Sequence, residues 1–135
     1  MKRLLPFCLV LALAACGTAS VKSVAIACKK EPRAFAREAR EILTKNDYKV
    51  LEIDELTGFI KAFRQEYDLL FGDKPIVVSP KVIELAPSAD SVKAIIYSVG
   101  RDGKTPVRYW DERATDEFEK TSYMPLLNAL KDLCR

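Results

Sequence analysis

An apolar run near the N-terminus decides how much of this 135-residue chain is left to fold. Residues 4–15 carry no charge, and they directly follow the basic pair Lys2 and Arg3. A helix needs about 20 apolar residues to cross a bilayer, so a run of 12 is too short to span one. A basic start followed by a run of this length is typical of a cleaved secretory signal. We therefore expect residues 1–15 to be removed, which leaves 120 of the 135 residues.

The end of this run resembles the lipobox of bacterial lipoproteins. Leu13-Ala14-Ala15-Cys16 supplies an aliphatic residue, two small residues and a cysteine. The resemblance covers residues 1–17, and it implies cleavage before Cys16, a diacylglycerol on the Cys16 sulfur and acylation of the new amino terminus. Gly17 is not the aspartate that keeps many such proteins at the inner membrane, so the resemblance implies an outer-membrane location in a Gram-negative source. The alternative is an ordinary secretory signal in which the cysteine is incidental.

Cleavage at this point leaves a nearly neutral chain on a short tether. Without Lys2 and Arg3, 20 of the 22 basic residues remain against 19 acidic ones, so the formal charge falls from +3 to +1. Binding to nucleic acid usually requires a clustered basic patch, and we expect none. Residues 16–20 comprise the lipidated cysteine and the tether, and four extended residues reach about 13 Å. Residues 21–135 are expected to form one domain close to the membrane that holds the lipid.

Four cysteines are present, and the N-terminus accounts for two of them. Cys8 leaves with the signal, and Cys16 takes the lipid. Cys28 and Cys134 therefore remain, in an oxidising compartment. Cys28 lies on the inward face of the alternating run 21–28, and Cys134 ends a helical stripe of leucines. We predict a disulfide between them, which would stabilise the fold by about 4–5 kcal/mol in the chain-entropy model; two buried, unpaired thiols are the alternative.

The rest of the chain switches between the strand period and the helix period. Pro32 suits the first turn of a helix that ends near Asn46. A second helix is expected over the last 20 or so residues, with a kink or a second start at Met124-Pro125. Residues 68–75 are expected to form a loop. Period-two runs predict strands over residues 21–28, 48–54, 59–65, 76–85, 91–99 and 106–110.

The resulting order is β-α-β-β-β-β-(β)-α, which predicts an α+β fold. The opening strand, helix and strand have the size of a βαβ unit, so their two strands are expected to run parallel. The later strands are joined by short turns, including one at residues 101–104, and these favour antiparallel pairing. We expect a single, mostly antiparallel sheet with both helices packed on one face.

The absence of histidine limits the chemistry of the chain. It excludes Ser-His-Asp and Cys-His catalysis and every histidine-based metal site. Paired carboxylates at Asp54 and Glu55 could cut a glycosidic bond, but they also suit the turn at Gly58. A calcium site at Asp102-Gly103 would need more oxygen ligands than the sequence supplies there. We expect no catalytic residue, no metal and no cofactor. A second acidic group suits the start of the last helix and comprises Asp111, Glu112, Asp116 and Glu117.

Two segments are candidate binding surfaces. Arg108, Tyr109 and Trp110 belong to an aromatic and basic stretch, and these residue types often anchor interfaces. Trp110 is the only tryptophan, and it also suits a core position under the last helix. The apolar run Leu69-Leu70-Phe71 either tucks into the core or forms an exposed tip that contacts a partner or the membrane, so Phe71 is a fourth candidate.

Together these observations favour a non-enzymatic lipoprotein of the bacterial envelope that binds another envelope protein. The membrane is its first partner, through the lipid on Cys16, and no sequence pattern fixes an oligomeric state. One alternative is an inhibitor or immunity protein that blocks an incoming hydrolase or toxin. Another is a cell-wall hydrolase that uses Asp54 and Glu55.

Overall fold

The computed structural model describes residues 21–111, 113 and 117–135. The predicted signal peptide, the lipidated cysteine and the tether lie outside these residues, as do Glu112 and Asp116. Ten elements follow one another along the described chain: β1 (Val24–Ala27), α1 (Pro32–Lys45), β2 (Lys49–Ile53), β3 (Ile60–Arg64), β4 (Tyr67–Phe71), β5 (Lys74–Val78), β6 (Lys81–Pro87), β7 (Ser91–Val99), β8 (Pro106–Tyr109) and α2 (Glu117–Leu133).

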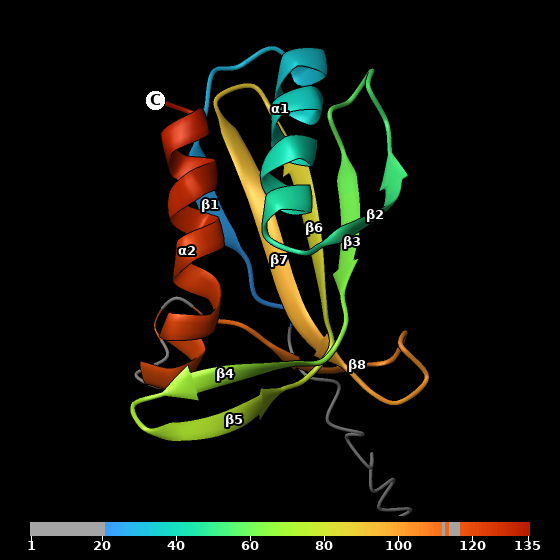
Figure 1. Cartoon of the computed structure of the whole chain (residues 1–135). Helices are drawn as coiled ribbons and strands as arrows, with labels where there is room; N and C mark the ends of the chain where they lie inside the picture. The colour runs from blue at the N-terminus through green and yellow to red at the C-terminus, as the bar shows by residue number, and fades with distance from the viewer. Residues whose placement is uncertain (1–20, 112, 114–116) are drawn as a thin grey trace, which may run out of the picture.

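Six strands form one antiparallel sheet. Five of them lie in the order β1-β7-β6-β3-β2, and β8 also pairs with β7. β1 pairs with the start of β7 and β8 pairs with its end, so β1 and β8 follow one another along the same edge. Both helices cover one face of the sheet (Figure 1). The predicted α+β fold, with a mostly antiparallel sheet and two helices on one face, is confirmed.

The opening βαβ pattern gives strands that point the same way but do not pair. Four antiparallel pairings connect β1 to β2 through β7, β6 and β3, so the first and last strands of this path have the same direction. α1 crosses the sheet between them. Pro32 begins this helix, and Asn46 ends it by donating from Nδ2 to the Ile42 carbonyl at 2.8 Å. Asp47 follows in the left-handed region with φ 65°, which turns the chain into β2.

The core lies between the helices and the sheet. Spacing by four residues places Phe35, Ala39 and Leu43 on the buried side of α1, and all three are at most 1% exposed. α2 presents its leucine stripe beside them. The largest fully buried side chains of both layers are Phe35, Leu43, Ile60, Ile83, Leu85, Ile96, Leu127, Leu130 and Val92.

The disulfide between Cys28 and Cys134 is present in the structure. Its Cα atoms lie 4.7 Å apart, and 106 positions separate the two residues in sequence. The bridge joins the segment after β1 to the end of α2, at the end of the molecule where the C-terminus lies (Figure 1). The prediction that these two cysteines pair is therefore confirmed.

The expected loop at residues 68–75 is wrong. This segment belongs to a hairpin in which β4 pairs with β5 around a turn at Gly72, whose φ is +66°. The sequence shows no period-two pattern here because the apolar Leu70 lies on the exposed side together with Asp68, whereas Tyr67 and Leu69 point inward. The expected strand at 76–85 is also divided into β5 and β6 at residues 79–80.

The second helix is continuous through Pro125, so of the expected kink or second start at Met124-Pro125, the second start is wrong. α2 runs from Glu117 to Leu133 with Pro125 in its interior. Pro125 is exposed, so water can bind the Thr121 carbonyl that loses its helical hydrogen bond. Neither helix within the described ranges is long and apolar enough to cross a membrane.

Candidate binding surfaces

The acidic residues considered for hydrolysis are engaged in local structure. Asp54 Oδ1 accepts hydrogen bonds from the backbone N–H groups of Leu56, at 2.9 Å, and Thr57, at 3.4 Å. Glu55 lies 3.9 Å from the Arg33 guanidinium. The Asp54 hydrogen bonds build the turn between β2 and β3, and the Glu55 contact joins this turn to α1. No cluster of three or more carboxylate or cysteine side chains suited to a metal occurs within the described part of the chain.

The turn between β7 and β8 depends on Asp102. Its Oδ1 accepts from the backbone N–H groups of Lys104 and Thr105, both at 2.9 Å, and its Oδ2 accepts from the Thr105 hydroxyl. The hydrogen bonds from Thr105 and then Lys104 lower the pKa of Asp102 to about 2. Gly103, with φ +70°, completes the turn. Asp102 therefore acts as a turn residue in this structure.

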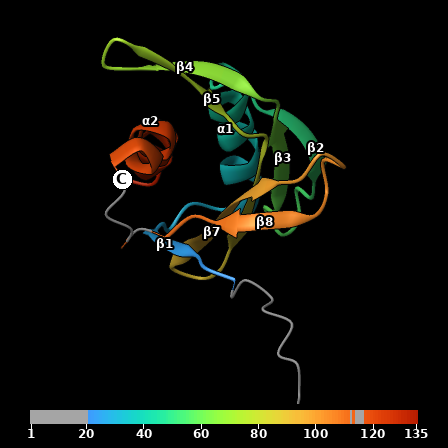
Figure 2. The same cartoon turned by 90° about the horizontal axis from the view of Figure 1, so that it is seen from below.

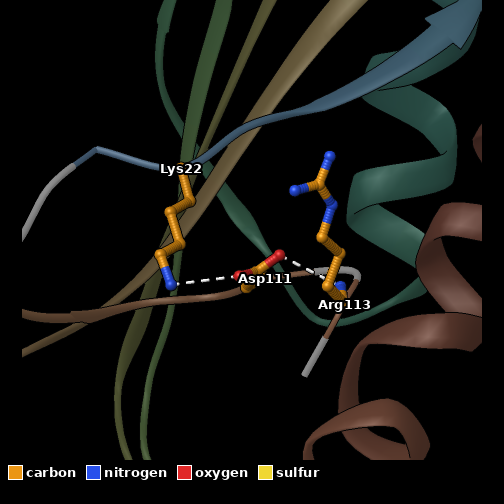
Figure 3. Close-up of polar contacts among 3 residues, drawn as sticks. All are labelled: Lys22, Asp111 and Arg113. Atoms are coloured by element: carbon orange, nitrogen blue, oxygen red, sulfur yellow. Dashed lines mark hydrogen bonds and ion pairs between the residues drawn. The ribbon is translucent and has the colours of Figure 1, made fainter. Parts of the chain in front are cut away.

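Asp111 connects the start of the described chain to the segment before α2. It accepts a hydrogen bond from the Arg113 backbone N–H at 3.0 Å, and Lys22 Nζ lies 3.0 Å from its other oxygen (Figure 3). The Arg113 bond first, and then the Lys22 contact, lower the pKa of Asp111. Glu117, the other described member of this acidic group, lies 3.7 Å from Lys120. The side chains of Asp111 and Glu117 thus serve ion pairs and a chain turn.

Trp110 is a core residue. It is 2% exposed, and its ring centroid lies 5.4 Å from that of Tyr123 on α2. Its backbone N–H donates to the Ile96 carbonyl at 2.8 Å, which continues the pairing with β7 by one residue. The prediction that Trp110 lies on a partner-binding surface is wrong, because alternation along the strand turns its ring toward the helices and away from solvent.

Tyr109 belongs to a row of side chains on the opposite face of the sheet. Strand register places Phe63 beside Val82, Val82 beside Tyr97, and Tyr97 beside Tyr109. The two tyrosine rings lie 5.2 Å apart, and the row packs as a second, smaller core. Burial raises the pKa of Tyr97, and Glu84 and Tyr109 add to this effect. Tyr109 ends the row at the sheet edge, where it is half-buried.

The neighbours of Tyr109 on β8 are exposed. Between the pairs Val99–Pro106 and Ser98–Arg108 the register shifts, so Val107 is bulged out of the ladder. Val107 is 62% exposed, and Arg108 is exposed next to it. Val107, Arg108 and Tyr109 together form what we call the β8 surface. Its bulge is a feature that sequence analysis did not predict.

Phe71 lies near the tip of the β4–β5 hairpin and is 39% exposed. Leu70, beside it, is 72% exposed, whereas Leu69 is half-buried and lines a cavity of about 140 Å³ with residues of α2. Of the two interpretations of the run at residues 69–71, burial in the core is therefore wrong for Leu70 and Phe71. The two strands form a two-stranded sheet of their own, and the hairpin projects from the main sheet (Figure 2).

A cluster of cations and aromatic rings holds the base of this hairpin. The Arg64 guanidinium lies 3.5 Å from the Tyr67 ring centroid. Lys81 Nζ lies 4.5 Å from the centroid of the Tyr123 ring and 5.2 Å from that of Tyr67. Such contacts between a cation and a ring face are attractive, most of all where they are partly desolvated. The cluster therefore connects β3, β4 and β6 to α2.

Burial dominates the electrostatics of this cluster. It raises the pKa of Tyr67 and, strongly, that of Tyr48, which lines a cavity together with Arg64 and Tyr67; in both cases Arg64 opposes the rise. Lys81 is only 3% exposed. Its burial was not predicted, although the sequence carries a signal for it: Lys81 shares the inward side of its strand with Ile83 and Leu85. A lysine that is spaced by two from core residues of the same strand can be expected to place its side chain in the core.

Comparisons with known proteins add no family. No family model matches the sequence, and no curated protein matches it.

Proposed function

We propose that this chain is a lipid-anchored protein of the bacterial envelope whose domain binds another envelope protein and catalyses no reaction. The anchor is the diacylglycerol that the lipobox resemblance implies on Cys16, and Gly17 favours the outer membrane. The lack of histidine throughout the chain and the turn-forming roles of Asp54 and Asp102 support a binding function over hydrolysis.

The observation that carries the proposal is the bulge at Val107. It exposes an aliphatic side chain and an arginine beside a half-buried tyrosine, on a strand at the edge of the sheet. Apolar contact area flanked by arginine and tyrosine is typical of residues that anchor protein interfaces. The tether is short, so a partner in the same membrane can reach the β8 surface.

Site-specific photo-crosslinking in cells tests this proposal. A benzophenone amino acid replaces Arg108 in the full chain, and a matched variant carries it at Glu41, which is exposed on α1. We expect a discrete crosslinked protein from position 108 that position 41 does not give. No product from position 108, or the same products from both, contradicts the proposal. A hydrolase or toxin as the crosslinked protein assigns the inhibitory role.

A further inference from the structure

The outer face of the β4–β5 hairpin carries three apolar side chains and one carboxylate, and it points away from the domain. Strand alternation places Tyr67, Leu69, Ile76 and Val78 on the inner side, where Val78 is 2% exposed. The other side carries Leu70 and Val77, which are 72% and 59% exposed. Leu70 pairs directly with the exposed Pro75, and Val77 pairs with the exposed Asp68 near the base of the hairpin. We call Leu70, Pro75 and Val77 the outer hairpin face.

This face lies at the end of the molecule where the described chain begins. In Figure 1 the start of the described chain, the hairpin, β8 and the first turn of α2 lie at the same end, and the C-terminus lies at the other. Figure 2 views this end from below, with the hairpin and the start of the described chain on opposite sides of it. The ion pair between Lys22 and Asp111 holds the first described residues at that end. We call it the tether end, because residues 17–20 join it to Cys16.

The contacts of the hairpin with the domain fix the direction of its outer face. Leu69 lines a cavity together with Thr121, Ser122 and Leu126 of α2, so the inner side faces the domain. Arg64 packs on the Tyr67 ring at the start of β4. Because the inner side of the hairpin packs on the domain, its outer side faces away from the domain at the tether end.

We propose that the outer hairpin face rests in the interfacial region of the membrane that carries the protein's own anchor. This inference depends on the proposed lipidation of Cys16. Four extended residues reach about 13 Å, which keeps the tether end at the bilayer surface. Apolar side chains held there need little intrinsic affinity, since the anchor makes their contact with lipid intramolecular.

The charges of the hairpin indicate whether its contact with a membrane depends on anionic lipids. Asp68, Asp73 and Lys74 are its ionisable side chains apart from Tyr67, so the hairpin is not basic. Contact with the membrane is therefore driven by apolar burial and by the tether, without attraction to anionic headgroups. The same contact is expected in neutral and in anionic vesicles.

Tryptophan quenching by brominated lipid tests the inference. The full chain is expressed, and its mature form is reconstituted into phosphatidylcholine vesicles with and without brominated acyl chains. One variant carries Leu70→Trp. The matched control carries Leu56→Trp, which is 81% exposed in the β2–β3 turn at the opposite end of the molecule (Figure 1). The native Trp110 is buried in both and supplies a common background.

We expect brominated lipid to quench the emission added by Leu70→Trp and to leave that of Leu56→Trp unchanged. Adding phosphatidylglycerol should not alter this difference. If the mass of the mature protein shows the lipid but Leu70→Trp is not quenched, the inference is overturned while the anchoring stands. An emission that shifts to the blue only when solubilised envelope proteins are added assigns the face to a protein and also overturns it. A mature protein without lipid overturns both the anchoring and the inference.

Discussion

The two ends of this domain are built from similar turns but are held in different ways. At the disulfide end, Cys28 is bonded to Cys134, and Gly58 in the β2–β3 turn is packed under Pro87. At the tether end, the β4–β5 hairpin forms a separate two-stranded sheet. One end is closed by a covalent bond and close packing, whereas the other leaves an apolar face open. The difference supports the proposal that the tether end is the one that contacts other molecules.

The largest effect should come from the disulfide. Replacing Cys28 and Cys134 together by alanine removes a constraint on a long loop of the unfolded chain, and we expect the free energy of unfolding to fall by about 2–5 kcal/mol. Urea unfolding of the processed protein measures this loss. A reducing agent should lower the stability of the native protein by a similar amount and leave the double variant unchanged. Equal stability of the native protein and the variant would contradict the claim that the disulfide stabilises this end.

A pair of glycines compares the two ends directly. Gly58 has φ +79°, and a Cβ there would lie 2.8 Å from Pro87 Cγ and 3.0 Å from the Pro32 carbonyl oxygen. Gly72 in the hairpin has φ +66° and open space around it. Gly58→Ala should therefore cost about 2–4 kcal/mol from strain and overpacking. Gly72→Ala should cost only about 1–2 kcal/mol from strain. Urea unfolding of both variants checks the order, and equal losses would show that the two turns are packed alike.

A smaller effect concerns the acid stability of the tether end. Hydrogen bonds lower the pKa of Asp102 in the folded protein to about 2, from 3.8. A folded pKa below the unfolded one stabilises the fold above the unfolded value, and this stabilisation is lost as the pH falls toward 2. Asp102→Asn should therefore reduce stability at neutral pH slightly and flatten the loss of stability in acid. Thermal unfolding against pH measures this, with Asp73→Asn as a control that removes one carboxylate from the hairpin. An acid profile identical to that of the native protein would contradict the role of Asp102.

The regular parts of the fold could be predicted from sequence because their signals are local. Pro32 and the spacing of apolar residues define α1, and alternation defines β7. The disulfide followed from assigning the other two cysteines to the N-terminus. The predictions of α1 and β7 needed only the position of each residue within its own element, whereas the disulfide prediction also needed a count of the cysteines left to pair.

The candidate surfaces were harder to predict because they depend on contacts between elements. Trp110 has the residue type of an interface anchor, but alternation along β8 turns its ring toward Tyr123. In β4 the apolar Leu70 shares the exposed side with Asp68, so the segment shows no clear alternation of apolar and polar residues. The bulge at Val107 arises from a shift in register between two strands, and no property of the single β8 segment indicates it.

The central claim is that a lipid on Cys16 sets the tether end against a membrane, and the mass of the mature protein tests it most directly. When the full chain is expressed in a bacterial host, the mature protein extracted from membranes should begin at Cys16. Its mass should equal that of residues 16–135 plus a diacylglycerol and one further acyl chain. A Cys16→Ser variant should lack this added mass. A mature chain that starts at another residue and carries no lipid would contradict the account.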